Sequence, residues 1–166
     1  MSDHSGEAAF NDLVSLLDYP VFVVTTAAGD QLAGCLVGFT SQTSINPPRF
    51  LVGLSRNNHT FSVATKAEHL AVHLLPRTEL EVAELFGGQT GDDTDKFAQC
   101  RWHSGPAGMP ILDAAPAWFV GKVTRRFDLG DHVGHLLEPV SGSAPDELGE
   151  VITFSDVGHV EAGHEA

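Results

Sequence analysis

Short apolar stretches separated by turn residues run through most of the chain and predict a β-rich fold. Apolar and β-branched residues fill residues 19–26 and 32–39, and the sequence AGD at residues 28–30 supplies the turn of a hairpin between them. The sequence NPP at residues 46–48 disfavours a helix and predicts an extended corner. A third strand is expected directly after it, at residues 50–54.

The second half of the chain continues this organisation. Residues 69–74 suit a strand by their length and by the proline that follows. Residues 117–127 and 132–140 form the clearest hairpin in the sequence, joined at the turn sequence DLG. Residues 87–108 are rich in Gly and Asp, which predicts a loop with one helical turn around residues 95–97.

Three short helices are expected among these strands. Apolar residues at helical spacing predict an amphipathic helix within the first 18 residues, whose apolar face should pack on the barrel; they are Phe10, Leu13, Val14 and Leu17. An asparagine at residues 57–58 can cap a second helix that runs to about residue 66. Thr78 and Glu81 form a capping box that predicts a third helix ending near Phe86.

The length of the chain indicates one folded domain. It has 166 residues, 42% of them hydrophobic, which suffices for one packed core and is too short for two ordinary domains. We expect an N-terminal helix at residues 1–18, a barrel domain at residues 19–143 and an acidic C-terminal extension at residues 144–166. The extension contains acidic residues and no Lys or Arg. It should therefore be solvated and partly flexible, with an added strand expected at residues 151–154.

The charge balance limits the partners. Nine Lys and Arg residues against 22 Asp and Glu give a formal net charge of −13, which repels nucleic-acid backbones and anionic membrane surfaces. A phosphate-bearing ligand would therefore need a local cluster of donors. No stretch approaches the roughly 18 apolar residues of a membrane span, and the N-terminus has no signal-peptide pattern, so we expect a cytoplasmic protein.

Several kinds of site lack a sequence signal. Cys35 and Cys100 lie far apart without a second pair of ligands, which argues against a disulfide framework and a metal site. His69 and His73 fall on an expected strand, without the helical geometry of a paired metal site. The chain has no Walker loop, GxGxxG sequence or nucleophile elbow, so P-loop, Rossmann and hydrolase functions lack support.

Three segments carry candidate chemistry. Residues 34–48, GCLVGFTSQTSINPP, run from a strand into hydroxyls and amides that can surround a polar ring; an ordinary polar loop is the alternative. Residues 55–60, SRNNHT, combine a guanidinium with donors suited to a terminal phosphate; a plain capping turn is the alternative. Asp131 and His132, at the last hairpin turn, can orient a substrate or move a proton, unless they form an ordinary surface turn.

In their order and spacing, these segments resemble the flavin reductase-like, FMN-binding split-barrel family over residues 19–140. The resemblance rests on YPVFVVTT, GCLVGFTSQTSINPP, FLVGLSRNNHT, AEHLAVHLL, ELFGG followed by DKF, and GDHVGHLLEPV. It implies a mainly β split barrel with short helices, and a homodimer that binds one FMN per subunit. It also implies a flavin reductase that takes hydride from NADH or NADPH and commonly supplies a partner monooxygenase.

The resemblance also assigns site residues. Those expected to line the flavin ring and ribityl chain are Val37, Gly38, Phe39, Thr40, Ser41 and Gln42. Those expected at the phosphate end are Ser55, Arg56, Asn58, His59 and Thr60, while Phe86 and Gly87 would close the pocket. Asp131 and His132 match a Gly-Asp-His sequence of the family, whose histidine lies near the flavin and the nicotinamide.

One departure from the family keeps other functions open. Many relatives have a hydroxyl-rich Thr-x-Ser-Ser stretch where this chain has LVGF at residues 36–39, so contacts to the flavin N5 and O4 must come from backbone groups, Thr40 or Ser41. A flavin-binding store, sensor or electron-transfer protein without turnover is the alternative, and a cofactor-free interaction domain is a third. FAD or a deazaflavin could replace FMN. Arg125 and Arg126 could meet the 2′-phosphate of NADPH or form a solvated pair.

Overall fold

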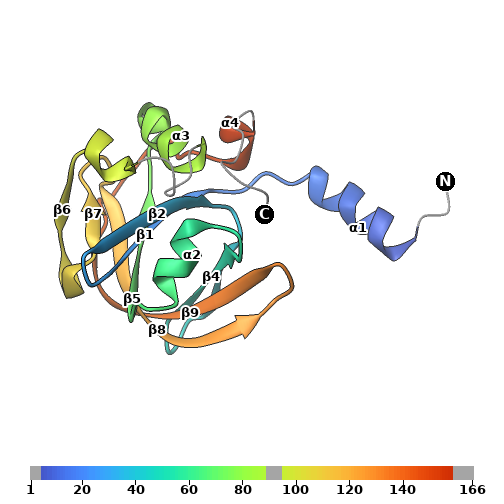
Figure 1. The fold of residues 1–166 in the computed structure, drawn as a ribbon. Helices are drawn as coiled ribbons and strands as arrows, with labels where there is room; N and C mark the ends of the chain where they lie inside the picture. The colour runs from blue at the N-terminus through green and yellow to red at the C-terminus, as the bar shows by residue number, and fades with distance from the viewer. Residues whose placement is uncertain (1–4, 89–94, 159–166) are drawn as a thin grey trace.

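Seven antiparallel strands form one curled sheet in the computed structural model, which describes residues 5–88 and 95–158 (Figure 1). The order in the sheet is β2-β1-β5-β8-β9-β4-β3. The strands are β1 (Phe22–Ala28), β2 (Gln31–Val37), β3 (Thr40–Ser44), β4 (Arg49–Ser55), β5 (His69–Leu74), β8 (Ala117–Asp128) and β9 (His132–Ser143). The expectation of a mainly β barrel is confirmed.

Short helices and a second hairpin flank this sheet. The helices are α1 (Gly6–Ser15), α2 (His59–Ala64), α3 (Leu80–Gly88) and α4 (Phe154–Val157), and the hairpin pairs β6 (Trp102–Ser104) with β7 (Pro110–Leu112). Sequence reasoning found the first three helices and missed the second hairpin. The predicted capping box is wrong: a 3-10 turn at Arg77–Glu79, without a side-chain cap, precedes α3.

Strand alternation builds the core inside the barrel. Val24, Cys35, Val52 and Leu54 are buried together there, and Ala64 of α2 packs among them. Because β2 and β4 both contribute to this cluster, the sheet must curl until its two ends approach each other. The curl brings the loop after β2 close to the strand pair β4–β9.

A second core joins α3 and the β6–β7 hairpin to the barrel. Phe86, Leu112 and Ile152 are buried in it. The buried His73 of β5 fixes the hairpin, because its Nδ1–H donates to the carbonyl of Val23 at 2.9 Å and its Nε2 accepts from the amide of Leu112 at 3.1 Å. Burial lowers the pKa of His73 from 6.5 to about 4, so the ring is neutral near pH 7 and acts as a structural link.

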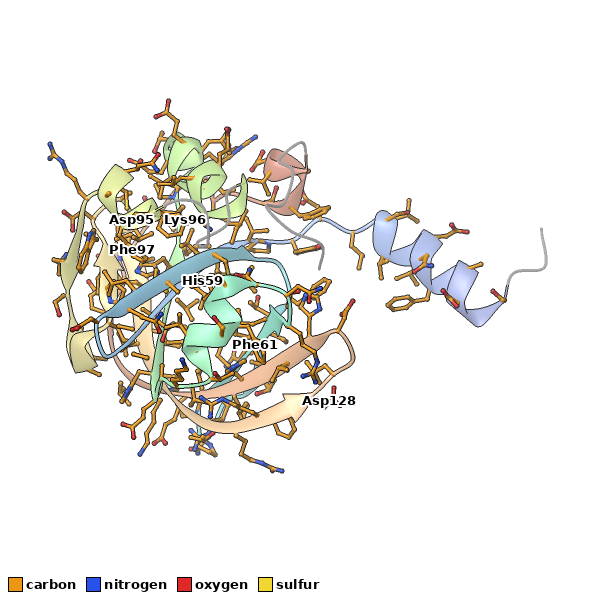
Figure 2. All side chains as sticks on the ribbon, in the orientation of Figure 1. His59, Phe61, Asp95, Lys96, Phe97 and Asp128 are labelled. Carbon is orange, nitrogen blue, oxygen red and sulfur yellow. The ribbon has the colours of Figure 1, made fainter. Side chains whose placement is uncertain are left out.

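The DKF sequence anchors the same core. Asp95 accepts from the amides of Phe97 and Ala98, and so caps the helical turn Lys96–Gln99 that was expected here. Lys96 is buried, and its Nζ donates to the carbonyls of Gly34 and Phe86 at 3.1 and 2.9 Å (Figure 2). The chain therefore uses these residues to fasten α3 to β2.

The N-terminal helix differs from expectation. α1 forms where its periodicity predicts it, and Ser5 caps it, but none of its residues is buried. Phe10, Leu13 and Leu17 are 62%, 56% and 52% exposed, and the helix projects away from the barrel (Figure 1). The expectation that this helix packs on its own barrel is therefore not met within the chain. No helix of the described residues is long and apolar enough to cross a membrane.

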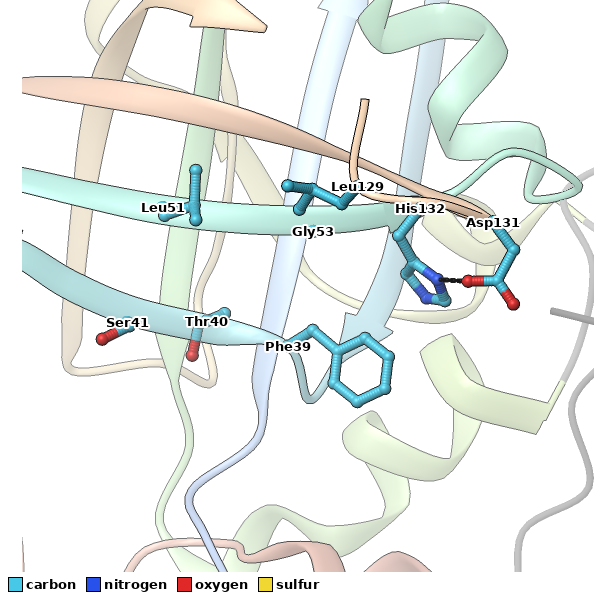
Figure 3. Close-up of a pocket in the computed structure, with 8 residues that line it drawn as sticks. All are labelled: Phe39, Thr40, Ser41, Leu51, Gly53, Leu129, Asp131 and His132. Carbon is cyan, nitrogen blue, oxygen red and sulfur yellow. Dashed lines mark hydrogen bonds and ion pairs between the residues drawn. The ribbon is translucent and has the colours of Figure 1, made fainter. Parts of the chain in front are cut away.

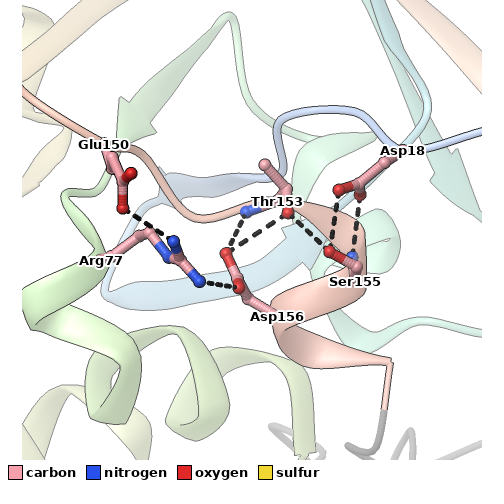
Figure 4. Close-up of polar contacts among 6 residues, drawn as sticks. All are labelled: Asp18, Arg77, Glu150, Thr153, Ser155 and Asp156. Atoms are coloured by element: carbon pink, nitrogen blue, oxygen red, sulfur yellow. Dashed lines mark hydrogen bonds and ion pairs between the residues drawn. The ribbon is translucent and has the colours of Figure 1, made fainter.

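The C-terminal segment is more ordered than its composition suggests. Ile152 is buried, with its amide on the carbonyl of Leu75, and isolated β-bridges replace the expected strand at residues 151–154. A polar clasp of six residues holds the segment, namely Asp18, Arg77, Glu150, Thr153, Ser155 and Asp156 (Figure 4). Residues 145–158 are thus part of the fold, whereas residues 159–166 lie outside the described residues.

Acid should loosen this clasp. Hydrogen bonds from Ser155 hold the pKa of Asp18 below its ordinary value of 3.8, and those from Thr153 do the same for Asp156. Groups with a lowered folded pKa stabilise the fold above their unfolded pKa, and that stabilisation is lost as pH falls through the folded pKa. As the pH is lowered below 3.8, we expect hydrogen-exchange protection of the Ile152 amide to fall before that of β5 does. Equal protection of both sites at acidic and neutral pH would contradict this.

Candidate functional site

A surface hollow of about 380 Å³ lies where the curled sheet brings three segments together (Figure 3). Its lining residues are Phe39, Thr40, Ser41, Leu51, Gly53, Leu129, Asp131 and His132. The loop after β2 and the start of β3 form one side, and the turn between β8 and β9 forms the other. The first and third segments predicted from sequence therefore meet at one site.

Gly53 of β4 is the contact point between these two sides. Its amide donates to the carbonyl of Phe39 at 2.8 Å, and it pairs with Gly134 of β9. A Cβ at this position would lie 3.3 Å from the Cβ of Phe39 and 3.9 Å from that of His132. The missing side chain lets the Phe39 and His132 rings approach, with their centroids 4.7 Å apart. An isolated glycine within a strand commonly marks such a close approach.

His132 and Asp131 form a hydrogen-bonded pair at the rim. The Nδ1 of His132 lies 2.6 Å from Oδ1 of Asp131 (Figure 3). Since a carboxylate only accepts, Nδ1 carries the proton, and Nε2 is left as the second polar atom of the ring. The histidine side chain is 16% exposed and the aspartate 75% exposed. The pair can thus orient a polar ligand group at the edge of an otherwise apolar hollow.

The Ser55–Thr60 segment adjoins this rim, but several of its polar groups form hydrogen bonds within the segment. Ser55 is buried, pairs with His132 across β4 and β9, and accepts from the amide of Asn57. Asn58 caps α2 by accepting from the amide of Thr60 at 2.9 Å, as predicted, and Thr60 is buried. His59 opens α2 and is partly exposed. The capping-turn interpretation of this segment therefore holds for Asn58.

Arg56 differs from expectation. Its Nη2 donates to Oδ1 of Asp128 at 2.8 Å, and its Nε donates to the carbonyl of Gly130 at 3.1 Å. The guanidinium predicted to meet a phosphate is therefore bound to the turn between β8 and β9. Arg56 in turn holds the pKa of Asp128 below its ordinary value, chiefly through this hydrogen bond.

Several predicted residues lie away from the hollow. Val37 and Phe86 are buried in the two cores, so their side chains do not face it. A Cβ at Gly87 would lie 2.9 Å from Leu36, which places this glycine against β2. Gly38 lies against Tyr19, and Gln42 is exposed on β3 with its amide on the carbonyl of Ser44. The structure thus gives Phe86 and Gly87 a packing role in place of the expected closure of a pocket.

Three lining residues were missed by sequence reasoning. Leu51 and Gly53 were assigned only to a strand, and Leu129 only to a turn. The isolated Gly53 within an apolar strand was a usable signal, and so was the alternation that puts Leu51 and Gly53 on one face. The exposure of Leu129, at 55%, depends on the turn geometry and had no sequence signal.

The described residues contain no group of three or more His, Cys, Asp or Glu able to hold a metal ion. Cys35 and Cys100 are both free thiols, the first buried and the second partly buried.

Arg126 donates to the carbonyls of Ala64 and Ala67, and Arg125 lies over the ring of Phe127. The arginine pair is thus engaged with the barrel wall.

Comparisons with known proteins place the sequence of this chain among flavin reductases. Residues 14–161 match the family described as the flavin reductase like domain. The chain is 33% identical over 119 residues to the stachydrine N-demethylase reductase subunit Stc3 of Rhizobium meliloti, covering 69% of this chain and 50% of Stc3. It is 30% identical over 150 residues to the FMN reductase (NADH) RutF of Cronobacter sakazakii, covering 90% of each. The chain spans 36% of a probable flavin reductase of R. meliloti.

Solved structures give the same fold. The NADH:FAD oxidoreductase SgcE6 of Streptomyces globisporus C-1027 superposes with a TM-score of 0.82 at 22% identity, covering 94% of this chain and 92% of SgcE6. SgcE6 has also been solved in complex with NAD and FAD fragments. At this identity the likeness concerns the fold, and it confirms the predicted split barrel.

Proposed function

This chain belongs to the flavin reductase-like domain family, and on that premise we propose that it is an NADH-dependent flavin reductase that binds FMN. The observation that carries the proposal is the meeting of Phe39, Gly53 and His132 around one hollow. The curated relatives named above, a NADH-dependent FMN reductase and a demethylase reductase subunit, support the same activity.

The residues at the hollow fit a planar ring with a polar rim. Phe39, Leu51 and Leu129 supply apolar walls, while Thr40 and Ser41 supply hydroxyls. A volume of about 380 Å³ is within the range of small-molecule sites. The sequence resemblance leads us to expect a hydroxyl-rich stretch where this chain has LVGF. Polar contacts to the ring edge are therefore assigned to Thr40, Ser41 and the backbone.

The cofactor supplies the redox chemistry when bound, since a flavin accepts hydride from a reduced nicotinamide. The protein aligns the two rings and excludes water. In this proposal the apolar walls hold the isoalloxazine, and His132, oriented by Asp131, seats the nicotinamide nucleotide. The segment from Ser55 to Thr60 is assigned to the phosphate end, with the partly exposed side chain of His59 as its donor. No residue of the chain needs to act as a general acid or base.

Replacing His132 with alanine should therefore raise the KM for NADH more than it weakens FMN binding. The lost hydrogen bond to a charged or polar group corresponds to about a tenfold change. Steady-state kinetics with NADH and a fluorescence titration with FMN measure the two effects, and Asp131→Asn should give a smaller change of the same kind. If loss of FMN dominates, His132 belongs to the flavin contact set and this assignment is wrong.

The partner of the reaction is proposed from the relatives. Stc3 is the reductase subunit of a demethylase, and another structural neighbour is a component B of nitrilotriacetate monooxygenase. We propose that this chain supplies reduced flavin to a separate monooxygenase. The acidic surface, with a net charge of −13, would then favour a partner with a basic docking face.

We also propose that the protein is a cytoplasmic homodimer. The exposed apolar face of α1 supports the dimer, because apolar side chains at helical spacing are normally covered. In the proposed dimer, α1 of one copy packs on the other copy. Light scattering of the purified protein should give the mass of two chains, and removal of residues 1–15, which contain α1, should weaken the association. A full-length protein that stays monomeric at micromolar concentration would contradict the proposal.

A further inference from the structure

We infer that Arg56 is a positioning residue that fixes the β8–β9 turn carrying Leu129 and His132, and that it is not a ligand of the flavin phosphate. The inference rests on the proposed function, since this turn is one wall of the hollow assigned to flavin and nicotinamide. It also replaces the phosphate role that the sequence resemblance gives to Arg56.

Three contacts join Arg56 to the turn. Its backbone amide donates to the carbonyl of Asp131 at 3.0 Å, Nε donates to the carbonyl of Gly130 at 3.1 Å, and Nη2 donates to Asp128 at 2.8 Å. The contacts reach three of the four residues that precede His132. Because an arginine fork holds its donors in a fixed plane, these contacts fix both the position and the tilt of the turn.

The Asp128 carboxylate that accepts from Arg56 also accepts from the backbone of the turn. Oδ1 of Asp128 also accepts from the amide of Gly130 at 3.2 Å, and the amide of Leu129 donates to the carbonyl of His132 at 3.0 Å. Gly130 has a φ of 126°, a conformation that residues with a side chain rarely adopt. Asp128 therefore accepts hydrogen bonds from both the Arg56 guanidinium and the turn. The unusual φ of Gly130 restricts the conformations open to that turn.

Charge and exposure argue against a phosphate role for Arg56. A carboxylate at 2.8 Å offsets the positive charge of the guanidinium for any third group. A phosphate would have to compete with Asp128 and with the carbonyl of Gly130. The side chains of Arg56 and Asp128 are 44% and 77% exposed, and such pairs add little to stability, so variants of either should fold.

The test compares Arg56→Gln and Asp128→Ala with the wild-type protein. We expect both to raise the KM for NADH by about tenfold, the factor that loss of a hydrogen bond to a charged group gives. Affinity for FMN and for riboflavin, which has no phosphate, should change by the same factor, because Leu129 on the released turn lines the wall assigned to the flavin ring. The double variant should be no worse than either single variant, since both break the same clamp.

The Arg77–Glu150 pair provides a matched control. Glu150 is 80% exposed and accepts from Arg77 at 2.7 Å, so Glu150→Ala removes a similar carboxylate far from the hollow and should leave both constants unchanged. The inference is overturned if Arg56→Gln weakens FMN but not riboflavin. That result would describe a phosphate ligand. The inference is also overturned if Asp128→Ala leaves the KM for NADH at the wild-type value, because the turn would then not depend on the Arg56–Asp128 pair.

A measurement on the ligand-free protein separates this inference from the proposed function. In NMR spectra, the His132 ring signals and the exchange protection of the Leu129 amide should change in Arg56→Gln and Asp128→Ala, and stay as they are in Glu150→Ala. Unchanged signals would overturn the positioning role whatever the activity. If the wild-type protein neither binds FMN nor oxidises NADH, the proposed function fails, while these spectra still decide the role of Arg56.

Discussion

Replacing Gly53 with valine should weaken flavin binding strongly while leaving the fold intact. A Cβ at residue 53 would lie 3.3 Å from the Cβ of Phe39 and 3.9 Å from that of His132, and valine adds two methyl groups to it. Overpacking of this kind costs about 1–3 kcal/mol, which corresponds to a tenfold to hundredfold loss of affinity for FMN. The measurement is a fluorescence titration of FMN, with circular dichroism to verify the fold.

Gly53→Ala is the graded control for this experiment. A lone Cβ needs a shift of only a few tenths of an ångström, so a smaller loss of affinity is expected. Both variants should keep the β4–β9 pairing, because valine and alanine are compatible with a strand. Wild-type affinity in Gly53→Val would show that the hollow lined by Phe39 and His132 is not the flavin site.

Replacing Phe86 with alanine should lower the stability of the protein and leave its site intact. Phe86 is 1% exposed and packs edge-on against Phe97 at 5.5 Å between ring centroids. Truncation of a buried phenylalanine costs about 3–5 kcal/mol, because it removes buried apolar surface and leaves a cavity. Urea denaturation measures the free energy of unfolding.

Phe39→Ala is the matched comparison, since it makes the same chemical change at a phenylalanine that is 59% exposed. It should change the free energy of unfolding little and weaken FMN binding. For Phe86→Ala, affinity measured on the folded fraction should equal that of the wild type. A Phe86 variant of unchanged stability that loses FMN would restore the pocket-closing role suggested by the sequence resemblance.

The sequence predicted the barrel strands because their signal is local. The run at β5, the hairpin at β8–β9 and the cap at Asn58 each follow from neighbouring residues. Strand β3 was missed because TSQTS has no apolar residue; it becomes a strand by pairing with β4 at the edge of the sheet.

The contacts that shape the site could not be predicted in the same way. Arg56 and Asp128 are 72 residues apart in sequence, and their pairing depends on how β4 and β9 align. The role of Ile152 likewise depends on the clasp that binds residues 150–156 to Asp18 and Arg77. By contrast, the burial of Val37 follows from strand alternation with Ala33 and Cys35, and its assignment to the ligand could have been avoided.

The central claim is that the hollow lined by Phe39 and His132 binds a flavin that NADH reduces. The most direct test is the visible spectrum of the purified protein with FMN, recorded without oxygen before and after addition of NADH and, separately, NADPH. We expect saturable FMN binding and loss of the yellow flavin band with NADH. Bound FMN that stays oxidised with both nucleotides would contradict the reductase function and indicate a flavin-binding protein without turnover, and a protein that ignores FMN would contradict the site itself.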